Sequence, residues 1–336
     1  MGILKKNFLF FAIILIFSTS KTWAQKTQIK GFAEIVTTVQ DGNLSFGIGE
    51  QDLFITSEIS SRISFLGETV FRFSPSSPTD FNVSIERIIV IYNYKGNHNL
   101  VIGKHHTPVN YWNDTYHHGR VFFPTIKRPL LFAAEIIPIH TTGIGFQGLN
   151  LGKLRFGYNF MVGNGIASND SLDNDNTKSI TAAIHIKPKD DLRLGISYYH
   201  DVIAKGASVH GHVADERIDQ HLITGSLAYF GKKYELLAES TFGINHNDIV
   251  GNPVTMASYV YAGVRLKEKW VPYIRVDNLN YQNEELLFEN DNTTSIVGGV
   301  RYEINFLAVV KLEYQYTNSE ISGNDNSVTA QFAIGF

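Results

Sequence analysis

The sequence contains no cysteine, so it can form neither disulfide bonds nor thiolate metal sites. Secreted eukaryotic proteins usually use disulfides, so this absence argues against that class. An excess of basic residues is also lacking, because 29 Lys and Arg face 32 Asp and Glu. No basic face for nucleic acid is therefore expected. Phosphate-loop, dinucleotide-binding and nucleophile-elbow motifs are absent as well.

Long apolar runs are missing after residue 24. The longest covers five residues, as in Ile88 to Tyr92, whereas a spanning helix needs about 20. This excludes a helical membrane protein. A transmembrane β-barrel stays open, because each of its strands needs an apolar side chain only at every second position.

Residues 1–24 have the organisation of a secretory signal peptide. Lys5 and Lys6 precede ten apolar residues, Phe8 to Phe17, and Ala24 offers a small residue for cleavage. The alternative is a membrane anchor, but ten residues rise only about 15 Å as a helix. The rest of the chain, residues 25–336, is expected to be a single barrel domain.

The body of the chain alternates with period two. In the last eleven residues, Val328, Ala330, Phe332, Ile334 and Phe336 share one face. The same alternation runs through 153–162, 180–187 and 192–199, and it predicts β-strands. The terminal Phe336 resembles the signal that outer-membrane assembly machinery reads; a chance edge strand is the other interpretation.

Polar breaks divide the chain into sixteen expected strands. Seven breaks are short and lie near 60–62, 95–98, 150–153, 187–191, 231–233, 267–269 and 303–305. Eight are longer and span 39–51, 74–80, 106–138, 164–177, 202–218, 244–254, 280–292 and 318–325. Short and long breaks alternate, which is typical of outer-membrane barrels with short periplasmic turns and long external loops. Without a turn at 60–62 the count falls to fourteen.

An all-β transmembrane antiparallel barrel follows from these patterns. Unpaired backbone is untenable in hydrocarbon, so the first strand (28–38) is expected to pair with the last (326–336). Parity places ten charged side chains inward, which a wet lumen tolerates better than a packed core. These lumen-lining candidates are Glu58, Arg155, Arg193, Glu235, Glu239, Arg265, Arg275, Arg301, Lys311 and Glu313.

The break at 106–138 is the longest connector, and it is rich in apolar residues such as Phe122, Phe123 and Leu131. A loop exposed to solvent has little reason to be so apolar, so we expect it to fold inward and narrow the pore. Its cations would favour anions. The expected constriction residues are Lys104, His105, His106, Asp114, His117, His118, Arg120, Lys127 and Arg128.

Two His pairs in this segment raise the alternative of a metal site. Adjacent residues on a strand point to opposite sides, so at most one His of each pair could be a ligand. Histidines that hydrogen-bond and fix the loop are the favoured interpretation, and no metal or other cofactor is expected.

The same segment carries a family resemblance. Its residues read GKHHTPVNYWNDTYHHG and are followed by Lys127-Arg128-Pro129. Over about residues 100–145 the chain resembles a Bacteroidetes-type outer-membrane porin family that is distantly similar to phosphate-selective porins. The resemblance implies a sixteen-stranded pore. It does not carry phosphate selectivity over, because the expected Arg and Lys ladder is only partly present.

The sequence predicts a passive outer-membrane pore for small hydrophilic solutes, with an anion bias. One alternative is an outer-membrane enzyme that uses His117 or His118 with Asp114 as a base; no serine nucleophile lies in that loop, so no enzyme is expected. Another is a plugged barrel that serves as an adhesin or scaffold. Expected partners are outer-membrane lipid and lipopolysaccharide, the assembly machinery and small solutes, and a homotrimer is left open.

Overall fold

Backbone pairing between the first and last strands closes the chain into a barrel. Strand β1 (Lys26–Gln40) runs antiparallel to β18 (Gly323–Gly335), with Phe32 opposite Gly335 and Gln40 opposite Ser327. Gly31 and Phe336 exchange two backbone hydrogen bonds, of 2.8 and 2.9 Å. The predicted pairing of the two ends is confirmed, and it removes both free sheet edges.

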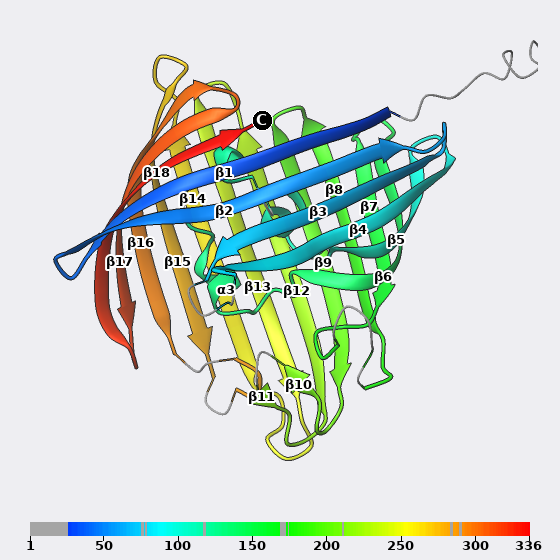
Figure 1. The fold of residues 1–336 in the computed structure, drawn as a ribbon. Coiled ribbons are helices and arrows are strands. Elements are labelled where there is room, and N and C mark those ends of the chain that lie inside the picture. Colours follow the sequence, from blue (N-terminus) through cyan, green and yellow to red (C-terminus); the bar gives the residue numbers. More distant parts are fainter. Residues whose placement is uncertain are drawn as a thin grey trace, which may run out of the picture.

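The computed structural model describes residues 26–74, 77, 79–116, 119–168, 173, 175–209, 212–282, 285–288 and 291–336. The predicted signal peptide, residues 1–24, lies outside them. Sixteen strands form the barrel (Figure 1). Between β1 and β18 these are β2 (Asn43–Glu58), β3 (Ile63–Phe73), β4 (Phe81–Lys95), β5 (His98–His106), β6 (His140–Leu151), β7 (Phe156–Gly163), β8 (Ser179–Lys189), β9 (Leu192–Ile203), β12 (Ile218–Phe230), β13 (Tyr234–His246), β14 (Val254–Val264), β15 (Trp270–Tyr281), β16 (Thr293–Asn305) and β17 (Ala308–Ser319).

The connectors at one end of the barrel are all short, as the sequence predicts. The β2–β3 turn at 59–62 is present, so the count is sixteen and not fourteen. The other end carries the long loops, and there two predictions are wrong. The expected loops at 39–51 and 318–325 are tight turns, at 41–42 and 320–322. The pair Asp41-Gly42, with φ of 50° and 78°, is a favoured two-residue hairpin turn.

Side-chain exposure follows the predicted alternation. On β15, Ile274 is 51% exposed on the outer surface, whereas the adjacent Arg275 is 1% exposed inside. On β17, Leu312 is 49% exposed and Lys311 is fully buried. The apolar rows therefore face outward, where lipid replaces water, and the ionisable rows face the interior.

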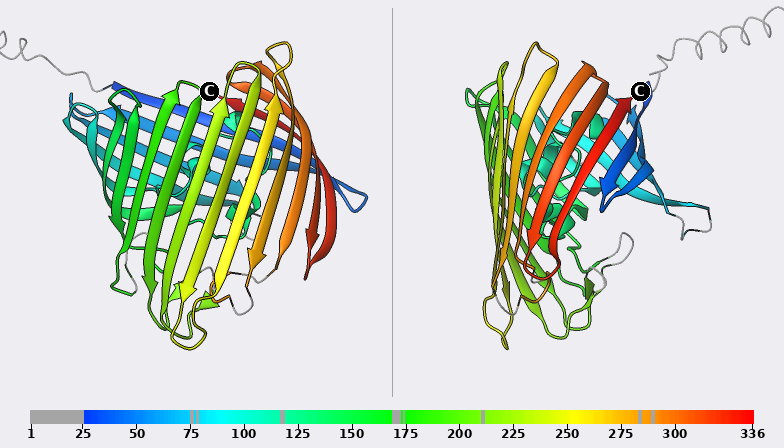
Figure 2. Two further views of the ribbon diagram at one scale, coloured as in Figure 1. Left: turned by 180° about the vertical axis from the view of Figure 1, so that it is seen from behind. Right: turned by 90° about the vertical axis from the view of Figure 1, so that its left-hand side faces the viewer.

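The connector between β5 and β6, residues 107–139, is named the third loop here. Its segments lie between the front and back walls of the barrel in both views of Figure 2. In Figure 1, β1 to β5 cross the front of the barrel at a shallow angle, and the strands behind them descend steeply. A further loop between β9 and β12 carries a small hairpin of β10 (Ser208–Val209) and β11 (His212–Val213).

Candidate functional site

The third loop contains three short helical segments. They are α2 (Tyr111–Thr115), the 3-10 turn η1 (Arg120–Phe122) and α3 (Leu130–Ala133). Asn110 caps α2 by accepting a 2.8 Å hydrogen bond from the backbone N–H of Asn113. Gly119 precedes η1 with φ +80°, and an added Cβ would contact the Phe32 ring at 3.2 Å. A glycine there lets the chain turn close to β1 and aims Arg120 at that wall.

Aromatic packing holds the loop against the back wall of the barrel. Trp112 is fully buried, and its ring meets Tyr259 of β14 edge to face at 5.9 Å between centroids. Phe123 lies 5.4 Å from Trp112, and Leu131 is buried in the same cluster. The apolar part of the third loop therefore packs on the barrel wall, as the sequence predicts. This apolar cluster excludes water from that side of the interior.

Inward carboxylates of the back wall accept hydrogen bonds from the loop backbone. Glu239 on β13 accepts from the N–H groups of Tyr111 and Trp112. Glu313 on β17 accepts from Ile126 N at 2.6 Å, and Asp277 on β15 accepts from Leu130 N at 3.2 Å. Each of these carboxylates therefore accepts a hydrogen bond from a fixed N–H group of the loop, where in an open lumen it would accept from water.

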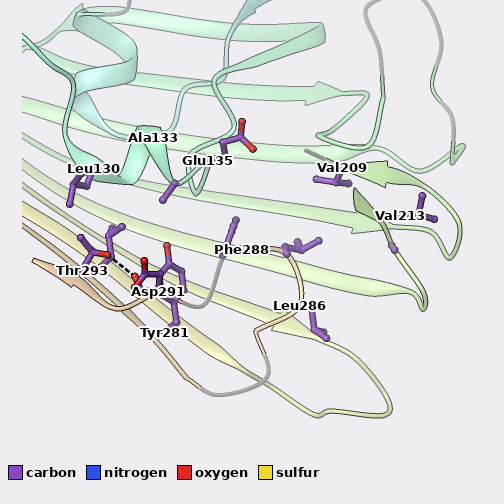
Figure 3. A pocket seen from close by; sticks show the side chains of 14 residues that line it. Leu130, Ala133, Glu135, Val209, Val213, Tyr281, Leu286, Phe288, Asp291 and Thr293 are labelled. Atoms are coloured by element: carbon purple, nitrogen blue, oxygen red, sulfur yellow. Dashed lines mark hydrogen bonds between the residues drawn. The ribbon is translucent and has the colours of Figure 1, made fainter. Parts of the chain in front are cut away.

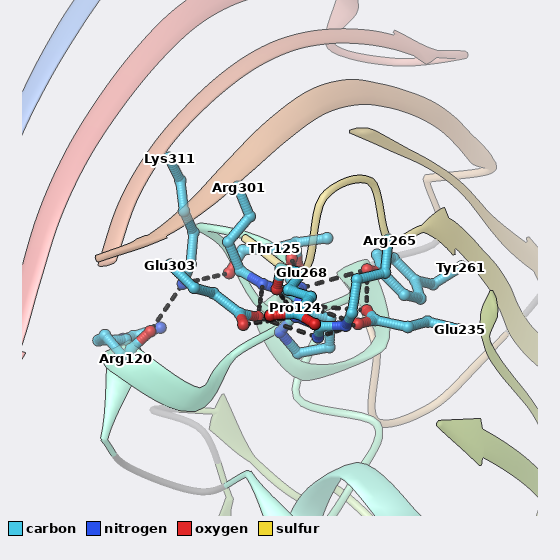
Figure 4. Close-up of polar contacts among 10 residues, drawn as sticks. All are labelled: Arg120, Pro124, Thr125, Glu235, Tyr261, Arg265, Glu268, Arg301, Glu303 and Lys311. Carbon is cyan, nitrogen blue, oxygen red and sulfur yellow. Dashed lines mark hydrogen bonds and ion pairs between the residues drawn. The ribbon is translucent and has the colours of Figure 1, made fainter. Parts of the chain in front are cut away.

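Inward cations bind the loop carbonyls in the same way. Lys311 Nζ donates to the carbonyl of Arg120 at 2.7 Å, and Arg301 donates to that of Pro124 at 3.1 Å (Figure 4). Arg275 donates to the carbonyl of Lys127 at 2.7 Å and forms an ion pair with Asp277 at 2.9 Å. The interior positions that parity predicts are therefore occupied by charges, but their contacts are to the loop.

A charge ladder continues from Arg301 towards the short-turn end. Glu235 accepts from Arg301 at 2.8 Å and from Arg265 at 2.7 Å, and Arg265 also pairs with Glu303 at 2.6 Å. The hydroxyl of Tyr261 donates to Glu235 at 2.8 Å. The expectation that water surrounds all ten lumen candidates is corrected here, because six of them lie in this packed half: Glu235, Glu239, Arg275, Arg301, Lys311 and Glu313.

A cavity of about 510 Å³ lies on the opposite side of the third loop. The loop contributes Arg120, Lys127 and Arg128 to its lining. The barrel wall contributes two acids, Glu34 of β1 and Glu50 of β2. Polar side chains of the barrel wall also line it: Thr38, Gln315, Thr329 and Gln331. The rest of the lining is apolar and consists of Val36, Ile126, Leu130, Phe132 and Ala133. We name this space the eyelet cavity.

Opposite charges are in contact in the lining of the eyelet cavity. Arg120 lies 3.2 Å from Glu50 and 3.6 Å from Glu34, so much of its charge is compensated. Lys127 is exposed. Burial and the nearby Arg120 lower the pKa of Arg128 to about 10, so its guanidinium stays cationic at neutral pH. With three cations and two acids in the lining, the formal balance is one positive charge.

Several predicted residues lie elsewhere. Lys104 shares the outward parity of Ile102 on β5, and its Nζ donates to the carbonyl of Ile85 at 2.7 Å, so its prediction as a constriction residue is wrong. Successive side chains of a strand point to opposite faces, so Lys104 points outward and its neighbour His105 points inward. Arg155 is also corrected, since it lies in the β6–β7 turn and pairs with Asp190. Glu58 is exposed at the end of β2.

The remaining predicted residues fall into three groups. Asp114 and Arg193 form an ion pair of 2.7 Å, and Arg193 also stacks over Tyr111 at 5.0 Å. His105 and His106 end β5, where the ring of His106 lies 5.5 Å from that of His140. His117 and His118 lie outside the described residues.

Sequence reasoning missed the two acids of the eyelet cavity. Glu34 alternates with apolar neighbours inside a strand that was predicted, so parity could have placed it inward. Glu50 was assigned to a loop at 39–51, but it lies inside β2, which begins at Asn43. The Asp41-Gly42 hairpin signal would have moved it into a strand.

Comparisons with known proteins give the fold class. No protein-family model matches the chain, and no curated protein matches its sequence. The structure of the anion-selective porin from Comamonas acidovorans is similar, at 12% identity and a TM-score of 0.67, over 93% of this chain and 100% of that one. OmpT of Vibrio cholerae, folded in vitro and in trimer form, is 14% identical with a TM-score of 0.63, over 92% of this chain and 99% of that one.

A third similar structure is Salmonella typhi OmpF in complex with daunomycin, at 12% identity and a TM-score of 0.64, over 93% of this chain and 98% of that one. Identities this low establish the architecture alone. The chain has the closed sixteen-stranded antiparallel barrel of outer-membrane porins.

Two further observations concern the described residues only. None of their helices is long and apolar enough to span a membrane. Within the same part of the chain, no three His, Asp or Glu side chains gather in an arrangement that could hold a metal ion.

Proposed function

We propose that this protein is an outer-membrane porin through which small hydrophilic solutes diffuse passively. The observation that carries the proposal is the eyelet cavity, about 510 Å³ of space between the third loop and the wall formed by β1, β2, β17 and β18. Its lining combines five charged and four polar side chains with an apolar part, and the charged and polar groups can contact hydrated solutes. The third loop, which is fixed by Arg275 of β15, Arg301 of β16 and Lys311 of β17, limits the size of the opening.

The same cavity supports a weak preference for anions. Three cations of its lining stand against two acids, Glu34 and Glu50, both of which lie close to Arg120. Glu50 also forms a 2.8 Å ion pair with Arg72 of β3, so the balance of charge in the opening is positive. A strong preference is not expected, because the two acids stand in the same opening. The resemblance of residues 100–145 to Bacteroidetes-type porins fits this proposal, and phosphate selectivity forms no part of it.

Planar-bilayer recording tests the pore. Purified, folded protein is expected to give stepwise conductance in KCl, with reversal potentials on the anion side in a salt gradient. The variant Arg120→Gln/Lys127→Gln/Arg128→Gln should reduce that preference. A matched control neutralises three exposed lysines at the short-turn end of the barrel, Lys153, Lys189 and Lys267. No conductance at any voltage would reject the pore, and unchanged reversal potentials in the loop variant would reject the assigned selectivity.

An enzyme is the weaker proposal. The base that the sequence offered combines His117 or His118 with Asp114, but Asp114 is already paired with Arg193 at 2.7 Å. A plugged adhesin or scaffold would need the eyelet cavity to be closed to solutes. Size-exclusion measurements with sugars of increasing mass in liposomes distinguish it from a pore, since a plugged barrel admits none.

The proposed setting is the outer membrane after removal of residues 1–24, with lipopolysaccharide around the external half of the barrel. Phe336 pairs with Gly31 at the barrel seam, and its side chain is 58% exposed, which leaves the ring accessible to assembly machinery. A homotrimer is proposed by analogy with the trimer form of Vibrio cholerae OmpT. Light scattering of the detergent-solubilised protein measures the number of chains.

A further inference from the structure

The exposed cations in the last third of the chain are confined to two turns at the short-turn end of the barrel. From residue 231 onward, the Lys and Arg residues are Lys232, Lys233, Arg265, Lys267, Lys269, Arg275, Arg301 and Lys311. Arg275, Arg301 and Lys311 face the interior, where they bind the third loop. The other five lie in the β12–β13 turn, 231–233, and the β14–β15 turn, 265–269.

These two turns form one continuous rim. The N–H of Arg265 donates to the carbonyl of Lys233 at 2.8 Å, and that of Glu303 donates to the carbonyl of Lys269 at 2.9 Å. The short-turn ends of β13 to β16 are therefore held side by side. Within the two turns the exposed lysines face one acid, Glu268, and the inner charge ladder compensates Arg265. The rim therefore carries net positive charge.

Two lysines of the rim have fixed positions. Lys269 Nζ donates to the carbonyl of Ile304 at 3.2 Å, which holds this ammonium group over the end of β16. Lys233 Nζ lies 5.3 Å from the centroid of the Tyr234 ring. An ammonium group has three N–H donors, so both lysines keep donors for an anionic ligand.

Aromatic side chains lie on the outer surface at the same level. Tyr234 follows the first turn and Trp270 follows the second, and both are exposed. The ring of Trp270 lies 4.5 Å from that of Tyr302 on β16. Trp and Tyr on the outside of a barrel are typical of the lipid headgroup layer, because an apolar ring carries a polar N–H or O–H group. The neighbouring lysines therefore lie at the level of the headgroups.

The outer surface next to the rim, towards the middle of the barrel, is apolar. Leu236 of β13, Val260 of β14 and Ile274 of β15 are all exposed on this face. The acyl chains of a lipid whose headgroup lies at the rim would pack along these rows.

The long-loop end of the same strands carries the opposite charge. Three stretches that include this end contain no Lys or Arg: 241–264, 276–300 and 312–336. Asp248 and Glu320 are exposed there, and Asp291 lies in the β15–β16 loop (Figure 3). An anionic lipid would be repelled at this end, so charge selects the leaflet at the short-turn end.

We propose that the rim of β13 to β16 binds anionic phospholipids of the phosphatidylglycerol class, in the leaflet at the short-turn end. The lipid phosphate pairs with the ammonium groups of Lys233 and Lys269. The indole N–H of Trp270 and the hydroxyl of Tyr302 are polar donors beside it, and the acyl chains follow the apolar rows. The proposal rests on the outer-membrane setting of the proposed function.

The chain contains its own reporter for lipid at this rim. Without residues 1–24, its tryptophans are Trp112 and Trp270. Trp112 is fully buried inside the barrel, whereas Trp270 is 47% exposed on the outer surface. Bromine atoms on acyl chains quench tryptophan fluorescence at contact distance, so brominated lipids report on the surroundings of Trp270.

Lipid competition measured with this reporter tests the proposal. The folded protein is reconstituted in phosphatidylcholine vesicles with a fixed fraction of brominated phosphatidylglycerol or, in parallel, of brominated phosphatidylcholine. Phosphatidylglycerol is expected to have a relative association constant about fivefold or more above that of phosphatidylcholine. Equal quenching by the two lipids would overturn the proposal. Glycerol phosphate in solution should not compete, and a preference abolished by it would show that the rim takes a free phosphate and not a lipid.

Variants locate the site, with brominated phosphatidylcholine as the reference in each. Lys233→Gln/Lys269→Gln should bring the association constant close to that of phosphatidylcholine. Lys233→Arg/Lys269→Arg keeps both charges and should keep the preference.

The matched control is Lys153→Gln/Lys189→Gln, which removes two exposed lysines at the short-turn end outside the rim. It should also keep the preference. An equal loss in the control and in Lys233→Gln/Lys269→Gln would show diffuse attraction and refute the site. An undiminished preference in Lys233→Gln/Lys269→Gln would refute it as well.

The lipid measurement does not depend on conduction, so the two proposals fail separately. A protein that conducts in planar bilayers but shows no preference for phosphatidylglycerol refutes the lipid site alone. A protein that shows the preference without conductance refutes the pore alone.

Discussion

The two sides of the third loop use charge in opposite ways. Towards the back wall, Arg275 and Lys311 are at most 1% exposed and donate to loop carbonyls. Towards β1 and β2, Lys127 and Arg128 line the eyelet cavity. The same residue types therefore serve as a structural support on one side and as a lining for solutes on the other. The difference is whether the loop backbone accepts each charge in a packed region or the charged side chain borders an open space.

The third loop lets the barrel be both charged and dry over half of its interior. A closed barrel of sixteen strands is too wide for side chains alone to fill. The third loop takes up that space, and its backbone groups need partners that the loop itself does not supply. Glu239, Glu313 and Asp277 accept from its N–H groups, and Arg301 donates to a carbonyl.

The largest effect is expected from Arg275→Met. This change leaves Asp277 buried without its cation. It also removes the hydrogen bonds that Arg275 donates to the Thr125 hydroxyl and the Lys127 carbonyl. Unfolding free energy in detergent should fall by about 3–5 kcal/mol, and single-channel conductance should rise as the loop loosens. Unfolding in guanidinium, monitored by tryptophan fluorescence, measures the unfolding free energy. Arg62→Met, on the exposed β2–β3 turn, is the control; equal stability of the two variants would contradict the structural role.

A smaller loss is expected from Glu239→Gln. The amide keeps the volume but has a single acceptor oxygen for the donors of Tyr111, Trp112 and Tyr259. We expect a cost of about 1–3 kcal/mol, from a weakened charge-assisted bond and an N–H group left without an acceptor. The same unfolding experiment applies, with the exposed Glu58→Gln for reference. A loss no greater than that of Glu58→Gln would show that the carboxylate does not anchor the loop.

On the cavity side, Glu34→Gln/Glu50→Gln should change selectivity and not stability. Removing both acids leaves the charge of Arg120 uncompensated at the eyelet cavity. Anion preference should increase severalfold, equivalent to about 0.5–1 kcal/mol. Reversal potentials in a KCl gradient measure it. A shift of selectivity towards cations would show that Glu34 and Glu50 do not compensate the charge of Arg120 in the eyelet cavity.

The smallest effect is expected from Lys104→Gln. Lys104 lies on the outward parity of β5, so its charge does not face the eyelet cavity. Conductance and reversal potential should equal those of the unchanged protein, and stability should change by less than about 0.5 kcal/mol. A reduced anion preference would show that the charge of Lys104 acts at the constriction after all.

Several parts of the candidate site were accessible from the sequence. Parity placed Arg275, Arg301 and Lys311 inward, and the apolar content of the third loop indicated that it packs inside the barrel. The function of those inward charges was misjudged. Lys311 and Arg120 are 191 residues apart in the chain and meet only because the barrel closes. Alternation says which face a side chain takes, but it does not say whether water or another segment occupies that face.

The sequence by itself determined the strands, the outward apolar rows and the joining of the two ends, because these follow from local alternation and from the need to pair every backbone group in lipid. Only the tertiary structure decided that the interior divides into a packed half and an open half. That division depends on contacts between the third loop and strands far along the chain, and on the ion pairs of Arg120 with Glu34 of β1 and Glu50 of β2. Such contacts are fixed by the curvature and closure of the sheet, which no stretch of sequence contains on its own.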